Sequence, residues 1–332
     1  MARLIAGTQC QEPRAGRLQL RCRSRGLTAA AVERARVEER SLLRTWVMRG
    51  TIHLVPTEDA DWLASLYSEA TATWSRRRLE QLGIAPAQRD RGLAAARRAL
   101  EGGGALPRSE VAAAAARAGF ELSAEARVHL AVLLCMEGIA CIGPGAGRET
   151  TFVAARDWIG ERKDVPRAAA LAELARRYYR AFAPATERDF AYWGGISLGD
   201  ARLGIAGAAS ALEERVLDGI AYVVPRGYVA RAPRSSVVRL LAAFDTYLMG
   251  YASRRHAVNE ARERLILPGG GVLRPTILVD GRFVGVWSQK RSGKAIRIAL
   301  APFEGFDEAW LPAIEEEIAD IGRFEGGEAS LA

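Results

Sequence analysis

The feature that most constrains this sequence is a unit of two short helices and a β-hairpin that recurs along the chain. In the clearest copy, helices over residues 110–118 and 123–137 are separated by Gly119, and strands at 139–142 and 150–154 flank a glycine-rich turn. Glycine and N-capping serine stand where such a unit needs its turns and helix starts. The pattern predicts a helix–turn–helix with a β wing, which is a winged helix.

The same pattern returns further along the chain. Residues 187–193 and 198–211 predict the two helices, and residues 212–224 predict a hairpin with Asp218-Gly219 at its turn. Residues 28–55 carry the back half of the unit, as a helix, a strand, a tight turn and a strand. Recurring units of one supersecondary type indicate a tandem array.

The last third of the chain has a different pattern. Residues 275–289 predict a hairpin around Asp280-Gly281, a basic turn leads to a strand at 296–302, and an acidic amphipathic helix covers 307–322. The fold class is therefore α+β and mainly α, with tandem winged helices followed by a small C-terminal β meander or barrel-like region and a final helix.

We predict four parts of the chain from these elements. They are a partial first winged-helix module with a glutamine motif at 1–56, a second module at 57–160, a third at 161–235, and a β-rich region with an acidic terminal helix at 236–332.

Cysteine, histidine and glycine usage argues against several classes of protein. Cys10, Cys22, Cys135 and Cys141 are scattered, and they form no spaced ligand set with the three histidines. Metal sites need clustered ligands, so we expect no metal. The sequence contains no glycine-rich phosphate-binding motif, so we expect no nucleotide cofactor. Free thiols, no secretory leader and no apolar run of about 18 residues predict a cytoplasmic protein outside the membrane.

The charge distribution favours a polyanionic partner. The chain has 47 basic and 39 acidic residues, a net charge of +8, yet residues 301–332 hold one arginine and nine acidic residues. A basic body that neutralises phosphates releases counterions, which favours nucleic acid. An arginine-rich soluble surface is the alternative. The second helix of the last winged unit has Arg202 as its one basic residue and is equally well interpreted as scaffold.

Four motifs stand in a fixed order along the chain. They are Thr8-Gln9-Cys10-Gln11-Glu12-Pro13, the stretch from Arg44 to Pro56, the stretch from Phe244 to Tyr251, and the stretch from Arg274 to Gly281. Together they resemble the AlkZ/YcaQ family of bacterial DNA glycosylases, and the resemblance extends from residue 4 to residue 324.

The resemblance implies an activity and a site. The catalytic element of the family is a glutamine, an apolar residue and then glutamine or aspartate, and Gln9, Cys10 and Gln11 match its double-glutamine form. The implied activity is excision of N7-alkylated purines from double-stranded DNA and unhooking of interstrand crosslinks. Tandem winged helices around a concave DNA-binding face, with a β-hairpin near the minor groove, are also implied. Family members carry a helix before the glutamines that this sequence lacks, so we expect apolar surface at Leu4 and Ile5 and a less firmly held Gln9.

Amide side chains suit this reaction because the leaving base is cationic. Glutamine donates and accepts hydrogen bonds but is no general base near neutral pH. An N7-alkylguanine already carries positive charge, so the enzyme has mainly to place a water and stabilise positive charge on the sugar. Gln9 and Gln11 are two residues apart, so both face one side of an extended segment and can hold one water. The alternative is that both are solvated surface residues.

Basic and polar residues on two hairpins are candidate DNA contacts. The candidates are Arg44, Arg49, Thr51, His53, Lys290, Arg291 and Lys294. A protruding basic hairpin can follow a groove of DNA. Ion pairs of Arg44 or Arg49 with Glu38 or Glu39, and a structural role for His53 at its turn, are the alternatives. Asp245 and Tyr247 are interpreted as structural residues.

These inferences predict a monomeric DNA repair glycosylase that associates with the nucleoid. No lysine lies near the glutamines, so we expect no Schiff base and no lyase step. A crosslinked base is hard to extrude, so a shallow site fits better than a closed pocket. Two other classes stay open. A non-catalytic winged-helix regulator would bind duplexes by sequence and tolerate changes at Gln9 and Gln11, and a sequestering protein would bind a free alkylating natural product without DNA.

Overall fold

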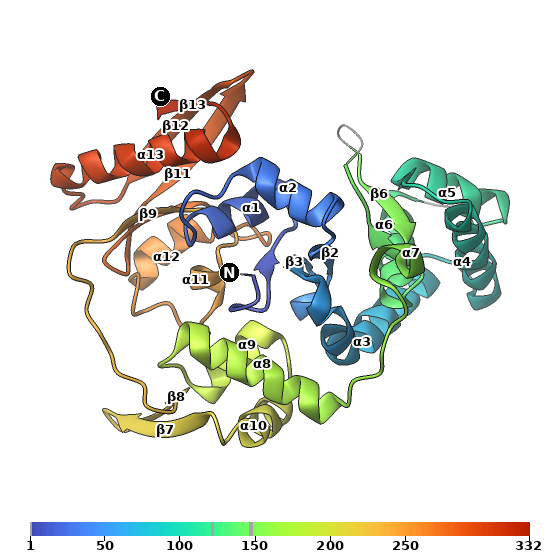
Figure 1. Cartoon of the computed structure of the whole chain (residues 1–332), viewed down its shortest axis with the longest axis horizontal. Helices are drawn as coiled ribbons and strands as arrows, with labels where there is room; N and C mark the ends of the chain where they lie inside the picture. The colour runs from blue at the N-terminus through green and yellow to red at the C-terminus, as the bar shows by residue number, and fades with distance from the viewer. Residues whose placement is uncertain (1, 121–122, 146–148) are drawn as a thin grey trace. The chain divides into compact units, whose positions relative to one another are not determined.

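The chain divides into two compact units (Figure 1), and the computed structural model describes residues 2–120, 123–145 and 149–332. The first unit consists of Met1–Glu33 and Ala172–Ala332, and the second consists of Arg34–Leu171. The predicted division into four modules cuts the chain at other positions and stays a prediction.

The second unit combines antiparallel strands with a helical core. Its strands are β2 (Leu42–Trp46), β3 (Ile52–Pro56), β4 (Leu106–Pro107), β5 (Ala140–Ile142) and β6 (Thr151–Ala154), which pair in the order β3-β2-β5-β6-β4. Its helices are α3 (Ala60–Gln81), α4 (Pro86–Glu101), α5 (Arg108–Arg117), α6 (Ala124–Met136) and α7 (Ala155–Ile159), and α2 (Ala29–Val37) leads into it. The winged helix predicted over residues 110–154 is confirmed as α5, α6 and the β5–β6 hairpin. Residues 146–148 of its predicted glycine-rich turn lie outside the described residues.

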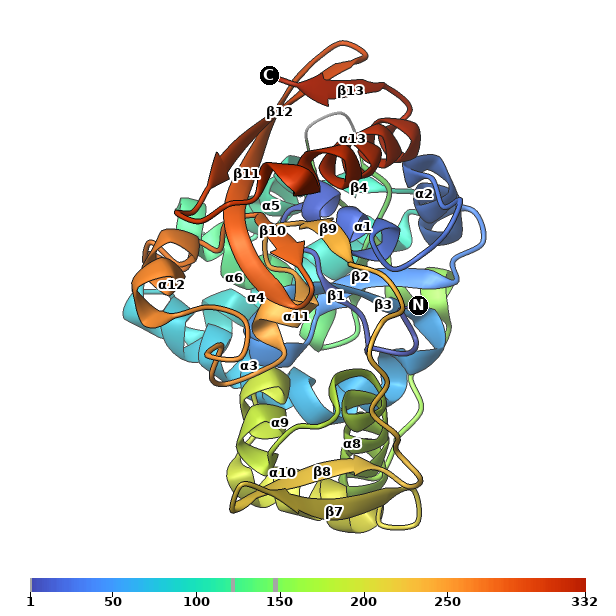
Figure 2. The ribbon, with the colours of Figure 1, turned by 90° about the vertical axis from the view of Figure 1, so that its left-hand side faces the viewer.

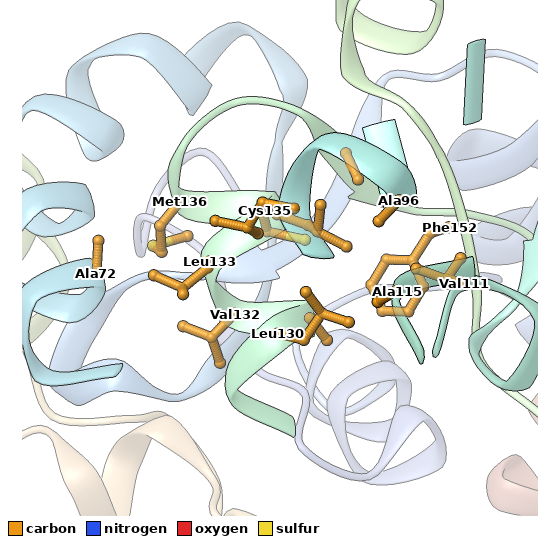
Figure 3. Close-up of a cluster of buried hydrophobic side chains, with 14 of the residues drawn as sticks. Ala72, Ala96, Val111, Ala115, Leu130, Val132, Leu133, Cys135, Met136 and Phe152 are labelled. Atoms are coloured by element: carbon orange, nitrogen blue, oxygen red, sulfur yellow. The ribbon is translucent and has the colours of Figure 1, made fainter. Parts of the chain in front are cut away.

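Helix α6 forms the centre of this unit. Ser123 caps it, because the Ser123 hydroxyl accepts a hydrogen bond from the Ala126 amide at 3.1 Å. Every residue from His129 to Met136 is buried, which is typical of a helix enclosed by other elements. Figure 3 shows Leu130 and Leu133 of α6 in the buried cluster, to which Phe152 of β6 also belongs.

The other complete winged helix belongs to the first unit, apart from the start of its leading helix. It consists of α8 (Arg167–Phe182), α9 (Glu187–Gly194), α10 (Leu198–Gly207), β7 (Leu212–Leu217) and β8 (Ile220–Pro225). Thr186 forms a capping box with Asp189 at the start of α9, and the Ser197 hydroxyl caps α10. Asp218 and Gly219 have positive φ angles of 49° and 76° at the β7–β8 turn, as the Asp-Gly pair predicts.

The C-terminal part of the first unit is a five-stranded sheet with a helix beside it. The strands are β9 (Val238–Leu241), β10 (Thr276–Val279), β11 (Arg282–Ser292), β12 (Ala295–Pro302) and β13 (Glu328–Leu331), in the order β13-β12-β11-β10-β9. Helices α11 (Thr246–Met249) and α12 (Glu260–Ile266) lie between β9 and β10 in the chain. Figure 2 shows α13 (Leu311–Glu325) along the sheet, where it contacts β13 and β9. The predicted meander and final helix are confirmed.

Several elements were not predicted from the sequence, among them α1 (Pro13–Arg21), α12 and β13. Helix α1 lies in an arginine-rich stretch, although Pro13 at its first turn is a recognisable start signal. Helix α12 is two turns long. Strand β13 pairs with β12 in parallel. Parallel strands are not joined by a hairpin turn, so no turn signal in the sequence predicts this pairing.

Candidate active site and DNA-contact residues

The two predicted catalytic glutamines lie in different backbone environments. Gln9 ends the short strand β1 (Thr8–Gln9) and is 8% exposed, whereas Gln11 lies in the bend before α1 and is exposed. The two-residue spacing predicts an extended segment through both residues. The strand ends earlier because the chain turns into the helix that Pro13 begins.

The glutamine segment is held against α1 by three close contacts. The Gln19 side-chain amide donates a hydrogen bond to the Gln9 carbonyl at 2.9 Å, and the Thr8 hydroxyl donates to the Gly16 carbonyl at 3.2 Å. Gly16 approaches Cys10 so closely that a Cβ on Gly16 would lie 2.5 Å from Cys10 Sγ. The expectation of a loosely held Gln9 therefore finds no support in these contacts.

Helix α1 is anchored in turn by a buried guanidinium. Arg21 donates hydrogen bonds to Glu317 at 2.8 Å and Asp320 at 3.0 Å on α13, and to the Leu240 carbonyl on β9 at 3.0 Å. Charge-assisted bonds of this kind are stronger than bonds between neutral groups. They tie the helix beneath the glutamines to the C-terminal sheet.

A second arginine ties the end of α1 to the core of the same unit. Arg23 donates two hydrogen bonds to the fully buried Asp245 carboxylate, at 2.6 and 2.8 Å, and Asp245 also accepts from the Tyr247 amide. The interpretation of Asp245 as structural agrees with these bonds. Burial raises the pKa of the neighbouring Cys22 thiol to about 12, so this thiol is protonated and a poor nucleophile at neutral pH.

The predicted DNA contacts of the first wing belong to the second unit. Arg44 lies on β2 and is half-buried, and Arg49 adopts a positive φ of 57° in the tight turn. The Thr51 hydroxyl donates to the Met48 carbonyl at 3.1 Å. His53 is 2% exposed and its Nδ1 is 3.0 Å from the Thr51 carbonyl, so the ring donates its proton to the turn. This geometry favours the structural role that the sequence analysis left open for His53.

We expect the buried His53 to make the protein less stable in acid. Burial, together with the charge of Arg49, lowers the pKa of His53 from 6.5 to about 3. Between these values the unfolded chain binds a proton that the folded chain does not. The free energy of unfolding is therefore fully retained above pH 6.5 and falls by about 1.4 kcal/mol per pH unit below it.

His53→Asn tests this expectation, since asparagine retains a donor for the Thr51 carbonyl and does not titrate. Denaturant unfolding at about pH 6 and about pH 4 should show a larger loss of stability for the wild type than for the variant. Equal losses would show that His53 already titrates normally in the folded protein.

The predicted DNA contacts of the second hairpin belong to the first unit. Lys290 and Arg291 lie near the end of β11, Lys294 lies in the turn before β12, and all three are exposed. Arg291 pairs with the buried Glu325 at 3.2 Å, and Glu325 also pairs with Arg14 of α1 at 3.1 Å. One carboxylate thus links the basic hairpin to the helix that holds the glutamine segment. The DNA contacts of both hairpins remain predictions.

Residues that shape the site were missed by the sequence analysis. Gly16 and Gln19 stand three residues apart, on one face of α1, and both contact the glutamine segment. One signal could have found Gln19. Gln19 interrupts the apolar pair Leu18 and Leu20, and a polar side chain on a buried face usually has a specific partner.

Further properties of the described ranges bear on the class of protein. Within them, no group of three or more histidine, cysteine, aspartate or glutamate side chains is placed to hold a metal ion. In the same ranges, no helix combines the length and the apolarity needed to cross a membrane. Tandem winged helices and an exposed basic hairpin are typical of the class of winged-helix proteins that act on DNA.

Comparison with known proteins gives the family. A family model described as "DNA glycosylase AlkZ-like" matches residues 2–324. The chain belongs to this AlkZ-like DNA glycosylase family, as its motifs predict, and it is an enzyme that hydrolyses N-glycosyl bonds in DNA. The resemblance seen in the sequence and the expected fold class are confirmed.

Two comparisons with proteins of Streptomyces sahachiroi agree with this assignment. The chain is 28% identical over 343 residues to an "Interstrand DNA cross-link repair glycosylase", which covers 97% of this chain and 89% of the relative. It also matches the solved structure of "DNA glycosylase AlkZ" with a TM-score of 0.78 at 24% identity, over 100% of this chain and 91% of the other. The structural match shows the shared fold.

Proposed function

We propose that this glycosylase releases cationic N7-alkylpurines from duplex DNA, and that it unhooks interstrand crosslinks, by placing a water with Gln9 and Gln11. The observation that carries the proposal is the contrast between a firmly held Gln9 and an exposed Gln11 in one short segment. A glutamine whose backbone is held in place, next to an exposed glutamine, can orient a water against a substrate that arrives from outside. The name of the 28% identical relative, a crosslink repair glycosylase, supports the same substrate class.

The chemistry asks little of this pair beyond orientation. A cationic base leaves without being protonated, so no acid is required on the leaving group. Amide dipoles that are already oriented stabilise positive charge on the sugar without a cost of reorganisation. A crosslinked base cannot be fully flipped out of the duplex, so it requires a shallow site. The exposure of Gln11 is compatible with such a site.

The test is single-turnover base release from a duplex with one N7-methylguanine and from a duplex with a nitrogen-mustard crosslink. Gln9→Ala and Gln11→Ala should each lower the rate constant at least tenfold, because each removes a preorganised dipole, and duplex affinity should be retained. Gln81→Ala, at an exposed glutamine that ends α3, is the control and should release base at the wild-type rate. Wild-type rates of base release in both Gln9→Ala and Gln11→Ala would overturn the glutamine mechanism.

A non-catalytic regulator is less well supported. Its reading helix would be α10, where Arg202 forms two hydrogen bonds of 2.9 Å with Glu187 and the neighbouring Leu203 is 62% exposed. A helix that reads bases presents several free polar or basic side chains to the major groove. Sequence-selective duplex binding without base release would favour this alternative.

A further inference from the structure

The buried side chain of Gln19 makes one hydrogen bond within the described part of the chain, and its partner is the backbone of a proposed catalytic residue. Gln19 is fully buried on α1, and its Nε2 donates to the Gln9 carbonyl at 2.9 Å. Its Oε1 is buried and has no hydrogen-bond partner among the described residues. The orientation of the amide is fixed, since the opposite orientation would set two oxygens against each other.

Stability alone does not explain a buried glutamine at this position. A buried acceptor without a partner loses its hydrogen bond to water and gains none in the fold, so it destabilises the protein relative to an apolar group of similar shape. The neighbours Leu18 and Leu20 are buried as well, so leucine would suit this face of α1. The compensating feature is the bond that fixes the Gln9 carbonyl.

The backbone of Gln19 is itself held from the other side. Its carbonyl accepts hydrogen bonds from Arg23 at 3.1 Å and from the Cys22 thiol at 3.3 Å. Arg23 is fixed by the buried carboxylate of Asp245. A continuous set of hydrogen bonds therefore runs from the core of the first unit through Gln19 to Gln9.

We infer that Gln19 is a positioning residue for base excision, which acts by fixing the backbone of Gln9 and thereby the direction of the Gln9 amide. This inference rests on the proposed function of Gln9. Gln19 is buried behind the glutamine segment and acts through it. Its contribution is preorganisation, since a catalytic dipole that is out of place by about 1 Å can lose most of its effect.

A double-mutant cycle with Gln9 is the direct test. Gln19→Leu should lower single-turnover release of N7-methylguanine about tenfold and leave the affinity for lesion-free duplex unchanged. In the Gln9→Ala background the same change should have no further effect, because its target is gone. Thr276→Val, at a fully buried hydroxyl on β10 without a hydrogen-bond partner in the described residues, is the control and should keep the wild-type rate.

Gln19→Glu supplies a readout that a purely structural role would not give. When protonated, the introduced carboxyl group donates to the Gln9 carbonyl, and when ionised it repels it. Release by this variant should rise toward the wild-type rate as the pH falls, whereas the wild type should show no such rise. This variant also tests the inference if Gln19→Leu does not fold.

The outcomes distinguish failure of the proposed function from failure of the positioning role of Gln19. Wild-type release by Gln9→Ala would overturn the proposed function and this inference with it. Loss of release in Gln9→Ala, together with wild-type release in Gln19→Leu or with effects that simply multiply in the double variant, would overturn the positioning role alone. A pH profile of Gln19→Glu parallel to that of the wild type would also overturn it.

Discussion

Asp245→Ala is expected to destabilise the first unit by about 3–5 kcal/mol. The Asp245 carboxylate is fully buried and accepts two hydrogen bonds from Arg23, whose side chain is 20% exposed. Removing one partner of a buried ion pair leaves the other charge without its counter-ion in a poorly solvated place. The variant also loses the cap that Asp245 provides to the Tyr247 amide at the start of α11.

The measurement is denaturant unfolding near neutral pH, with the midpoint and slope compared between variant and wild type. Glu187→Ala is the matched control, because it also breaks an arginine pair with two hydrogen bonds, but one in which Arg202 is 63% exposed. Exposed pairs contribute about 0–1 kcal/mol. Similar small losses in both variants would show that the buried pair contributes no more than a surface pair.

Gly16→Ala is expected to lower base release about a hundredfold, which is the size of effect that a displacement of about 1 Å can have on catalysis. The new Cβ would lie 2.5 Å from Cys10 Sγ, 2.7 Å from Cys10 Cβ and 3.0 Å from Cys10 Cα. The last two atoms cannot swing away by side-chain rotation, so the segment between Gln9 and Gln11 must move off α1. Overpacking of this kind also costs about 1–3 kcal/mol of stability.

Gly199→Ala distinguishes this clash from a general effect of alanine in a helix. Gly199 lies in α10, and a Cβ there would lie at an ordinary 3.7 Å from the Ser197 hydroxyl. This control should retain the wild-type rate and gain about 0.5–1 kcal/mol, since alanine is the better helix former. Single-turnover release and thermal unfolding of both variants provide the test. Wild-type release by Gly16→Ala would show that the glutamine segment tolerates displacement.

The winged helices could be predicted from the sequence because their signals are local. Ser123, Thr186 and Ser197 cap helices within three residues of themselves, and the Asp218-Gly219 pair sets its turn by its own backbone preferences. Each of these features is decided within a few neighbouring residues. The same reasoning could not place β13. This strand pairs with β12 in parallel, and its position depends on the packing of α13 against it.

The candidate site also combines features that local sequence predicts with features that only packing decides. Gln9 and Gln11 could be proposed as a water-holding pair from their spacing and motif, because the two amides lie within one three-residue stretch of the sequence. Their unequal burial, and the side chain that fixes Gln9, follow from the packing of the segment on α1.

The sequence by itself determined the winged-helix repeats, the C-terminal meander and the family motifs, and it supplied the glutamine pair as a candidate site. The tertiary structure alone decided that Gln19 meets Gln9, that His53 is buried, and that Arg23 pairs with Asp245 from 222 residues away. The physical reason is range. Capping, turns and periodicity act over a few residues, whereas burial and ion pairing depend on which distant surfaces come together when the chain folds.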